Sequence, residues 1–502
     1  MNWRFRQRTP ARPVAATLCA LLIGLFYLAT FRNGHDWADD FSLYVRHAQN
    51  IARGEPYVQT GYIYNPQNPN IGPRVYPPGF PLLLAPVVRI SGLDLAPMKI
   101  LVLAFFVGSL LVMTRLFRTV LPPAYVAVLV LVVGVNPFFW EFKDHILSDI
   151  PFLFFVLLSL HLFTQADLSG ASGRRGATLA ALAGVAAYAS YATRTLALAL
   201  IPCFVGRDLI RDRRIGTNAA VATAVAVTLA GLQHVVWIRD VSYFDQISNP
   251  IPALQQNVPA YARALSDLWE NGYSDQLRKI AFVAGGALAA FGYVTSARAG
   301  VTVFHLFAPL YLVPVLLWPS YQGMRFLIPI VPFYFFYGLL GVRRIDAGAE
   351  RRWETKAPIL VVFLAAVTAS YAGRYSTLDF RALPEGIGKK ESRELFEFIT
   401  TATDPNDVLV FSRPRVLALM TRRSVSGGHR AVDPCDLWQY IREIGASYVI
   451  TGPARDPFNG DAVYLREFVA RSGDALRSVM ANSDLAVYRI ERNPCAPGRL
   501  AP

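Results

Sequence analysis

Residues 97–117 read PMKILVLAFFVGSLLVMTRLF, a long run of apolar side chains with few charges. The hydrocarbon core of a bilayer is about 30 Å thick, and a helix needs roughly 20 apolar residues to cross it. This run therefore predicts a transmembrane helix.

Similar runs recur on both sides of it. Breaks at Pro, Gly and basic clusters define eleven candidate spans, which are 14–31, 97–117, 123–140, 150–165, 176–192, 195–209, 217–237, 279–297, 300–318, 325–341 and 357–373. The composition agrees, because 53% hydrophobic residues, 17% charged residues and a mean hydropathy of +0.33 are typical of proteins that lie in lipid. We expect a polytopic α-helical membrane protein with about 11 transmembrane helices. The span 195–209 is short and contains Pro202.

The basic residues behind the net charge of +14 are dispersed in short clusters between the spans. A nucleic-acid-binding surface would need one exposed basic stripe, so no nucleic-acid partner is expected. Cytoplasmic loops of membrane proteins are enriched in Lys and Arg, and a cytoplasmic N-terminus requires such residues in every second gap. Those gaps contain Arg115, Arg118, Arg174, Arg175, Arg207, Arg211, Arg213, Arg214, Arg298, Arg343, Arg344, Arg351, Arg352 and Lys356.

The intervening gaps are mixed or acidic. The gap 238–278 contains Asp240, Asp245, Asp267, Glu270 and Asp275. At the start of the chain, Arg4, Arg6, Arg8 and Arg12 precede an apolar run that reaches Phe31 without a small-x-small cleavage site, which predicts an uncleaved signal anchor. We therefore expect a multi-pass protein of the cell inner membrane, with a cytoplasmic N-terminus and with the chain from Gly373 onward outside the cytoplasm.

The chain from Gly373 onward, called the tail below, differs in its sequence pattern from the apolar spans before it. Its pattern predicts helices at 391–403 and 437–444 and strands at 407–411, 448–450 and 485–490, which together suggest a small extracytoplasmic α/β domain. The expected division is a transmembrane domain 1–375, with a large first outer loop 32–96, and the α/β domain 376–502. The tail has no glycine-rich phosphate loop and no His/Cys metal spacing, so a docking or lid module is one reading of it. Cys435 and Cys495 both lie in this exported part, where a disulfide can form and add a few kcal/mol.

The loop 32–96 contains HDWADDFSLYVRHAQNIARGEPY, followed by RVYPPGFPLLLAP. A helix that begins at the acid pair Asp39–Asp40 would place Asp40, Tyr44 and His47 on one face. The alternative is that one of the two acids only caps an interfacial helix. The prolines after Tyr76 predict a rigid, extended and turn-forming segment.

More polar residues fall on the same predicted side of the membrane. Lys143, His145 and Asp149 lie in WEFKDHILSDIPF between the third and fourth spans, Arg194 ends the fifth span and Arg325 opens the tenth. Each one alone could be a flanking charge at the interface. Together they predict carboxylates and cations gathered at one leaflet.

Acids and bases at a membrane surface suit sugar transfer from a lipid-phosphate donor. A carboxylate removes the proton of the acceptor hydroxyl, and cations offset the charge of the departing phosphate. One base on the face opposite the leaving group implies inversion at the anomeric carbon.

At these residues the sequence resembles the C-type glycosyltransferase superfamily, in particular bacterial relatives of protein O-mannosyltransferases and lipid A aminoarabinose transferases. The resemblance covers roughly residues 14–375 and rests on DDFSLY, AQNIARGEPY, YPPGFPLLLAP, LSDIPF, YATR and RFLIPIVP in this order. It implies that Asp40 is the catalytic base with Asp39 beside it, and that Asp149 is the second acidic position. Phe41 stands where the family often has its second acid, which leaves the division of roles between Asp39 and Asp40 open.

The resemblance also implies the partners. The donor is a polyprenyl-phosphate sugar, and the acceptor is an envelope glycan, lipid or protein. The candidate substrate-binding residues are Arg194, Arg325, Tyr44, His47, Lys143, His145 and Tyr76. Some members of the family bind a divalent cation and others do not, so such an ion is a candidate cofactor.

Two other classes of function compete with a glycosyltransferase. A transporter or flippase for a lipid-linked glycan should carry ionisable residues at mid-membrane on broken helices. The predicted spans hold few such residues and the acids gather at one surface, which favours the enzyme. A scaffold of envelope synthesis would not require this one-sided clustering. The sequence does not name the sugar or the acceptor.

Overall fold

A computed structural model of the chain describes residues 14–68, 71–73, 75–169, 173–236, 250–319, 321–353, 358–381, 383, 386–452 and 461–495, without the side chains of 236, 348–353 and 461–462. The chain divides into two compact units. The helical unit contains residues up to Phe31 and Lys99–Phe380, and the sheet unit contains Arg32–Met98 and the chain from Arg381 onward. The first outer loop thus groups with the C-terminal segment, an association that the sequence analysis did not anticipate. The functional division at residue 375 stays a prediction.

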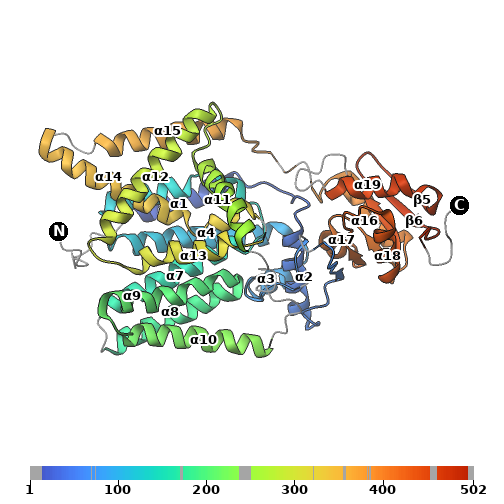
Figure 1. Ribbon diagram of the computed structural model, residues 1–502, viewed down its shortest axis with the longest axis horizontal. Helices are drawn as coiled ribbons and strands as arrows, with labels where there is room; N and C mark the ends of the chain where they lie inside the picture. Colours follow the sequence, from blue (N-terminus) through green and yellow to red (C-terminus); the bar gives the residue numbers. More distant parts are fainter. Residues whose placement is uncertain are drawn as a thin grey trace. The chain divides into compact units, whose positions relative to one another are not determined.

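The helical unit consists of helices that follow the predicted spans (Figure 1). Its elements are α1 (Val14–Ala29), α4 (Leu95–Phe117), α5 (Pro123–Gly134), α6 (Pro137–Phe142), α7 (Asp149–Leu168), α8 (Arg174–Thr193), η2 (Thr195–Ala199), α9 (Leu200–Asp212), α10 (Thr217–Val236), α11 (Pro250–Ser266), η4 (Asp267–Trp269), α12 (Asp275–Ala297), α13 (Val303–Leu316), η5 (Gly323–Leu327), α14 (Val331–Trp353) and α15 (Pro358–Thr377). Every predicted span overlaps one of them. Helices α7, α8 and α10 lie side by side.

Five of the described helices, α4, α7, α10, α12 and α15, are long and apolar enough to cross a membrane. Four shorter helices are also apolar, namely α1, α5, α13 and α3, which belongs to the sheet unit. Outward-facing leucines such as Leu18 and Leu25 of α1 are 53% and 61% exposed, as expected for side chains that face lipid. The expected polytopic helical fold is confirmed.

Two predicted spans are interrupted. The span 123–140 breaks between α5 and α6 because Asn136 caps the second helix, its side chain accepting a hydrogen bond from the Phe138 amide, and its own amide donates to the Tyr371 hydroxyl at 2.6 Å. The span 195–209 begins as the 3₁₀ helix η2 and continues as α9.

Several residues of the topology argument lie outside the described part of the chain. They are Arg4, Arg6, Arg8, Arg12, Asp240, Asp245 and Lys356, together with the side chains of Arg351 and Arg352.

The sheet unit is a mixed α/β structure. Its elements are α2 (Asp39–Arg53), β1 (Tyr62–Ile63), α3 (Gly79–Ser91), α16 (Lys390–Ala402), β2 (Val408–Val410), α17 (Pro414–Thr421), β3 (Ser424–Ser426), α18 (Pro434–Glu443), β4 (Ala446–Thr451), α19 (Asp461–Ser472), η6 (Gly473–Ala475), β5 (Leu476–Ala481) and β6 (Ala486–Ile490). The strand order is β1-β3-β2-β4-β6-β5. Strands β1 to β4 pair in parallel, whereas β6 pairs antiparallel with both β4 and β5.

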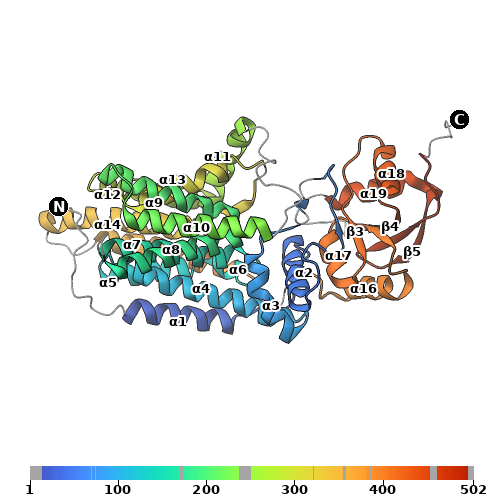
Figure 2. The same cartoon turned by 90° about the horizontal axis from the view of Figure 1, so that it is seen from below.

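The two helices and three strands predicted in the tail are present as α16, α18, β2, β4 and β6. Helices α17 and α19 and strands β3 and β5 were missed. Both faces of the sheet are buried: Val410 and Val449 belong to a core with α18 and α19, while their neighbours Leu409 and Ile450, which point to the opposite face, are also 0% exposed. Figure 2 shows α18 on one side of the strands and α16 on the other.

The edge strand β1 comes from the first outer loop. Tyr62 and Ile63 pair with Val425 and Ser426 of β3, and the Gly61 carbonyl accepts a hydrogen bond from the Val425 amide at 2.8 Å. Gly61 has a φ of +76°, and a Cβ atom there would lie 2.9 Å from a backbone oxygen, so this junction requires glycine. The sheet is therefore completed by residues far from the tail in sequence.

The segment after Tyr76 differs from the sequence prediction in one respect. Tyr76 to Pro78 is irregular, as predicted, but α3 begins at Gly79 and includes Pro81. A proline in the first turn removes an amide that has no partner within the helix, so the helix tolerates it.

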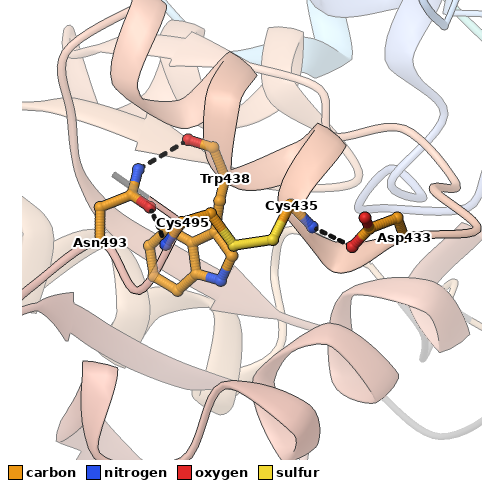
Figure 3. The surroundings of a disulfide bond; sticks show 5 residues. All are labelled: Asp433, Cys435, Trp438, Asn493 and Cys495. Carbon is orange, nitrogen blue, oxygen red and sulfur yellow. Dashed lines mark hydrogen bonds between the residues drawn. A yellow bond between two sulfur atoms is a disulfide. The ribbon is translucent and has the colours of Figure 1, made fainter. Parts of the chain in front are cut away.

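A disulfide joins Cys435, at the start of α18, to Cys495 near the end of the described chain (Figure 3). The two Cα atoms are 5.5 Å apart and the sulfurs 2.01 Å apart. Asn493 beside it donates to the Trp438 carbonyl at 2.9 Å. The predicted proximity of the two cysteines is confirmed.

Candidate active site

The acid pair Asp39–Asp40 opens helix α2 in the sheet unit. Carboxylates suit the first turn of a helix because the unpaired amides there carry partial positive charge. The helix ends at Gly54, which has the left-handed conformation of a C-terminal cap. Its buried face includes Phe41, Tyr44 and His47.

Asp39 also caps a second helix. Its Oδ1 accepts hydrogen bonds from the backbone amides of Arg415 (3.1 Å) and Val416 (3.3 Å), in the first turn of α17. Its Oδ2 is buried without a hydrogen-bond partner and lies 3.8 Å from Nε of Arg415. Burial raises the pKa of Asp39 to about 6, although Arg415, Arg413 and the Val416 amide lower it. Asp39 thus links α2 to α17.

Asp40 occupies a more open position. Its Oδ1 accepts hydrogen bonds from the Tyr76 hydroxyl at 2.6 Å and from Nη1 of Arg415 at 3.2 Å. Its side chain is 27% exposed, against 11% for Asp39. Of the two acids, Asp40 is therefore the one that a ligand can approach more easily.

Arg415 is the residue of this site that sequence reasoning missed. Its side chain is 1% exposed, and its guanidinium also donates to the Tyr76 hydroxyl at 2.8 Å and to the Pro73 carbonyl at 3.0 Å. It lies over the rings of Tyr62 and Tyr76. Burial opposes its charge, but the surrounding tyrosines and the acid pair outweigh that effect and raise its pKa. The FSRPRVLALM segment contains a proline at the first position of α17, which signals a helix start but not this contact.

Tyr44, His47 and Tyr76 lie together, as the predicted helix face requires. The rings of Tyr44 and Tyr76 are 4.8 Å apart. His47 is fully buried, contacts the Tyr57 carbonyl through Nδ1 at 2.8 Å and accepts from the Tyr76 amide through Nε2 at 3.4 Å. Burial lowers the pKa of His47 to about 3, so the ring is neutral and fixes two stretches of loop.

A second cluster lies in the helical unit. Asp149, the first residue of α7, is 1% exposed and pairs with Arg194 through Oδ1 and with Arg325 through Oδ2, the latter at 3.3 Å. Arg194 follows the last residue of α8, and its guanidinium lies 4.8 Å from the centroid of the Phe326 ring. Two guanidinium groups thus share one carboxylate, and guanidinium groups are suited to binding an anion.

Lys143 and His145 lie between α6 and α7. Lys143 forms a buried ion pair with the adjacent Asp144 at 2.7 Å and lies over the Trp140 ring. This neighbouring carboxylate offsets its charge, so Lys143 is a weaker candidate for phosphate than the two arginines. His145 is half-buried, with its ring 5.6 Å from that of Phe142.

The two carboxylates of the acid pair are not arranged to share one divalent cation. Sharing one ion would require both to turn their oxygens toward one point. Here the Arg415 side chain already lies against both carboxylates, and Asp39 Oδ1 is used as a helix cap.

No family model and no curated protein matches the chain. Its fold is similar to that of an oligosaccharyltransferase and to that of ArnT, which confirms the expected fold relationship.

Particular solved structures show this. The oligosaccharyltransferase AglB from Archaeoglobus fulgidus, in complex with an inhibitory peptide and a dolichol-phosphate, has a TM-score of 0.56 and 13% identity, over 88% of this chain and 69% of that chain. ArnT from Cupriavidus metallidurans, bound to undecaprenyl phosphate, has a TM-score of 0.55 and 12% identity, over 95% of this chain and 97% of that chain. An oligosaccharyltransferase of Archaeoglobus fulgidus in complex with Zn and sulfate has a TM-score of 0.57 and 14% identity, over 87% of this chain and 68% of that chain.

Proposed function

We propose that this chain is a membrane glycosyltransferase that moves a sugar from a polyprenyl-phosphate donor to an envelope glycan, lipid or protein at the outer face of the inner membrane. The observation that carries the proposal is the partly exposed Asp40 carboxylate, bound on one oxygen by Tyr76 and Arg415. The similarity in fold to an oligosaccharyltransferase with dolichol-phosphate and to ArnT with undecaprenyl phosphate supports a lipid-phosphate donor.

In the proposed reaction Asp40 accepts the proton of the acceptor hydroxyl. The acceptor oxygen then forms a bond to the anomeric carbon, while the bond from that carbon to the phosphate oxygen breaks and polyprenyl phosphate leaves with the electron pair. Attack from the face opposite the leaving group inverts the anomeric configuration. General-base catalysis of this kind contributes about 10²–10⁴ in rate.

The arginines of the helical unit take the phosphate in this proposal. Guanidinium binds phosphate in a bidentate fork, and both Arg194 and Arg325 are held by Asp149. In this role Asp149 orients the two guanidinium groups and keeps them from pairing with other acidic side chains. The predicted topology gives these residues and the acid pair the same side of the membrane.

No divalent cation is assigned to the acid pair, since Arg415 supplies the positive charge there. His47 is assigned to holding the loop that carries Tyr76, because both of its ring nitrogens contact backbone groups.

The test is glycan analysis of the cell envelope with and without the gene. A missing sugar, restored by the wild-type gene and not by D40N, names donor and acceptor together. An unchanged envelope would contradict the proposal, and accumulation of a lipid-linked sugar only on the inner leaflet would favour the flippase.

A further inference from the structure

Arg415 belongs to the C-terminal segment, yet its contacts are with the first outer loop. Its Nη1 donates to Oδ1 of Asp40 and to the Tyr76 hydroxyl, and its Nη2 donates to the Pro73 carbonyl. We propose that Arg415 is a positioning residue for the Asp40 carboxylate, so that the C-terminal segment completes the active site instead of serving as a docking or lid module. This inference rests on the proposed function, in which Asp40 is the base.

The way in which Arg415 binds Asp40 supports this role. Arg415 and Tyr76 both contact the same carboxylate oxygen, and they also contact each other at 2.8 Å. Three groups in mutual contact fix the rotamer of Asp40 while part of its side chain stays exposed. A cation at 3.2 Å also favours the ionised carboxylate, which is the form that can accept a proton.

Asp39 in turn holds Arg415 in place. Pro414 opens α17, and Asp39 accepts from the amides of the next two residues, so the start of this helix is fixed on the acid pair. The two adjacent acids therefore have different roles. Asp39 binds the backbone of α17, and Asp40 receives the side chain that α17 presents.

The partners of Arg415, and not its burial alone, distinguish it from a structural arginine. A buried charge is destabilising unless paired, and an apolar side chain of similar volume is often as stable. Arg423 provides the contrast within the same unit. It is also buried, but it contacts the Thr403 hydroxyl and backbone carbonyls of Ile399, Thr400 and Thr403, and none of its recorded contacts among the described residues is with a carboxylate.

The experiment compares R415Q, R415K, D40N and R415Q/D40N with the matched control R423Q in the full-length protein. The donor probe is the lipid-linked sugar fraction extracted from cells that lack the gene, and transfer to envelope material of those cells is measured against pH. Binding of undecaprenyl phosphate reports whether each variant is folded and inserted.

For R415Q we expect a 10- to 100-fold lower kcat with a nearly unchanged KM for donor. The acid limb of the kcat profile should move to higher pH, because R415Q removes the positive charge beside Asp40, whereas the neutral Tyr76 hydroxyl and the neighbouring Asp39 stay in place. R415K should recover part of the rate, since it keeps the charge but not the fork of donors. In the D40N background, R415Q should cause no further loss.

R423Q should behave differently. Its pH profile of kcat should be unshifted, and any loss of kcat that it causes should multiply with the loss caused by D40N. The same behaviour in R415Q, or an R415Q rate equal to wild type, would overturn the inference. If R415Q fails to bind undecaprenyl phosphate, R415K decides the matter: a wild-type kcat and pH profile would reject the role of Arg415. A wild-type protein that transfers no sugar would instead reject the proposed function.

Discussion

Asp40 and Asp39 are neighbours in sequence, but their environments give them different chemistry. Asp40 is bound by side chains and is partly exposed, whereas Asp39 is bound by two backbone amides and is nearly buried. Sequence reasoning could select the acid pair and place Tyr44 and His47 on the same helix face. It could not find Arg415, which lies 375 positions from Asp40, because no local periodicity relates the two residues.

Replacing Asp40 by Asn should lower transfer by roughly 10²-fold or more, because Asn keeps the size and some hydrogen bonding of Asp but cannot accept a proton. Replacing Asp39 by Asn should lower transfer less, since an Asn oxygen can still accept hydrogen bonds from the amides of α17. Envelope sugar content in complemented cells measures both. Near-normal transfer by D40N together with an inactive D39N would reverse the assignment.

The two arginines that are proposed to bind the donor phosphate allow a separate prediction. R194K and R325K should raise the donor concentration needed for half-maximal transfer by about 10-fold or more, because Lys cannot reproduce a bidentate fork. The protein should remain inserted. R263K is a suitable control, since Arg263 lies in α11 and has no ion pair in the described part of the chain. Unchanged donor dependence in both variants would remove these residues from the site.

At the scale of elements, the sequence predicted the long apolar helices well, because lipid imposes a simple length and composition on them. It failed where a polar side chain changes the course of the backbone, as Asn136 does between α5 and α6. It also missed β1 and β3, which have two and three residues and take their partners from distant parts of the chain.

The burial of Asp39 at the start of α17 should make stability depend on pH. Its folded pKa of about 6 lies above the usual 3.8, so the folded protein binds the proton more tightly than the unfolded chain. This contribution is fully present below about pH 4 and is lost as the pH rises through about 6. Relative to D39N, the apparent melting temperature of wild type should therefore fall over this window. D39A, which loses the cap, should be less stable throughout, and a pH-independent difference between wild type and D39N would contradict the assignment.

The disulfide should stabilise the sheet unit. Closing a loop of 60 residues restricts the unfolded chain by roughly 4 kcal/mol. C435S and C495S should therefore melt at lower temperature than wild type, and reduction should affect wild type alone. Of the four cysteines, Cys19 and Cys203 are free, so the unfolded, unreduced protein should react with two equivalents of a thiol reagent. Four equivalents would show that the bond is absent.

For the whole molecule, the alternation of basic gaps, such as those with Arg174 and Arg211, predicts the orientation in the membrane. We predict an odd number of spans and an exported C-terminus. An alkaline phosphatase fused after residue 502 should be active, whereas a reporter that works only in the cytoplasm should be silent there. The opposite pair of results would invert the topology and move the acid pair to the cytoplasmic side.

The ribosome makes strand β1 long before it makes β3, the strand with which β1 pairs. The ribosome makes the first outer loop 362 residues before Gly427, the glycine that follows β3 and accepts a hydrogen bond from Asn65. At about 5–20 residues per second, this interval is roughly 20–70 s. Throughout this interval the partner strand of β1 has not yet been made. Under the proposed function, a chain that ends before Arg415 should therefore be inactive, because it lacks the guanidinium group that contacts Asp40.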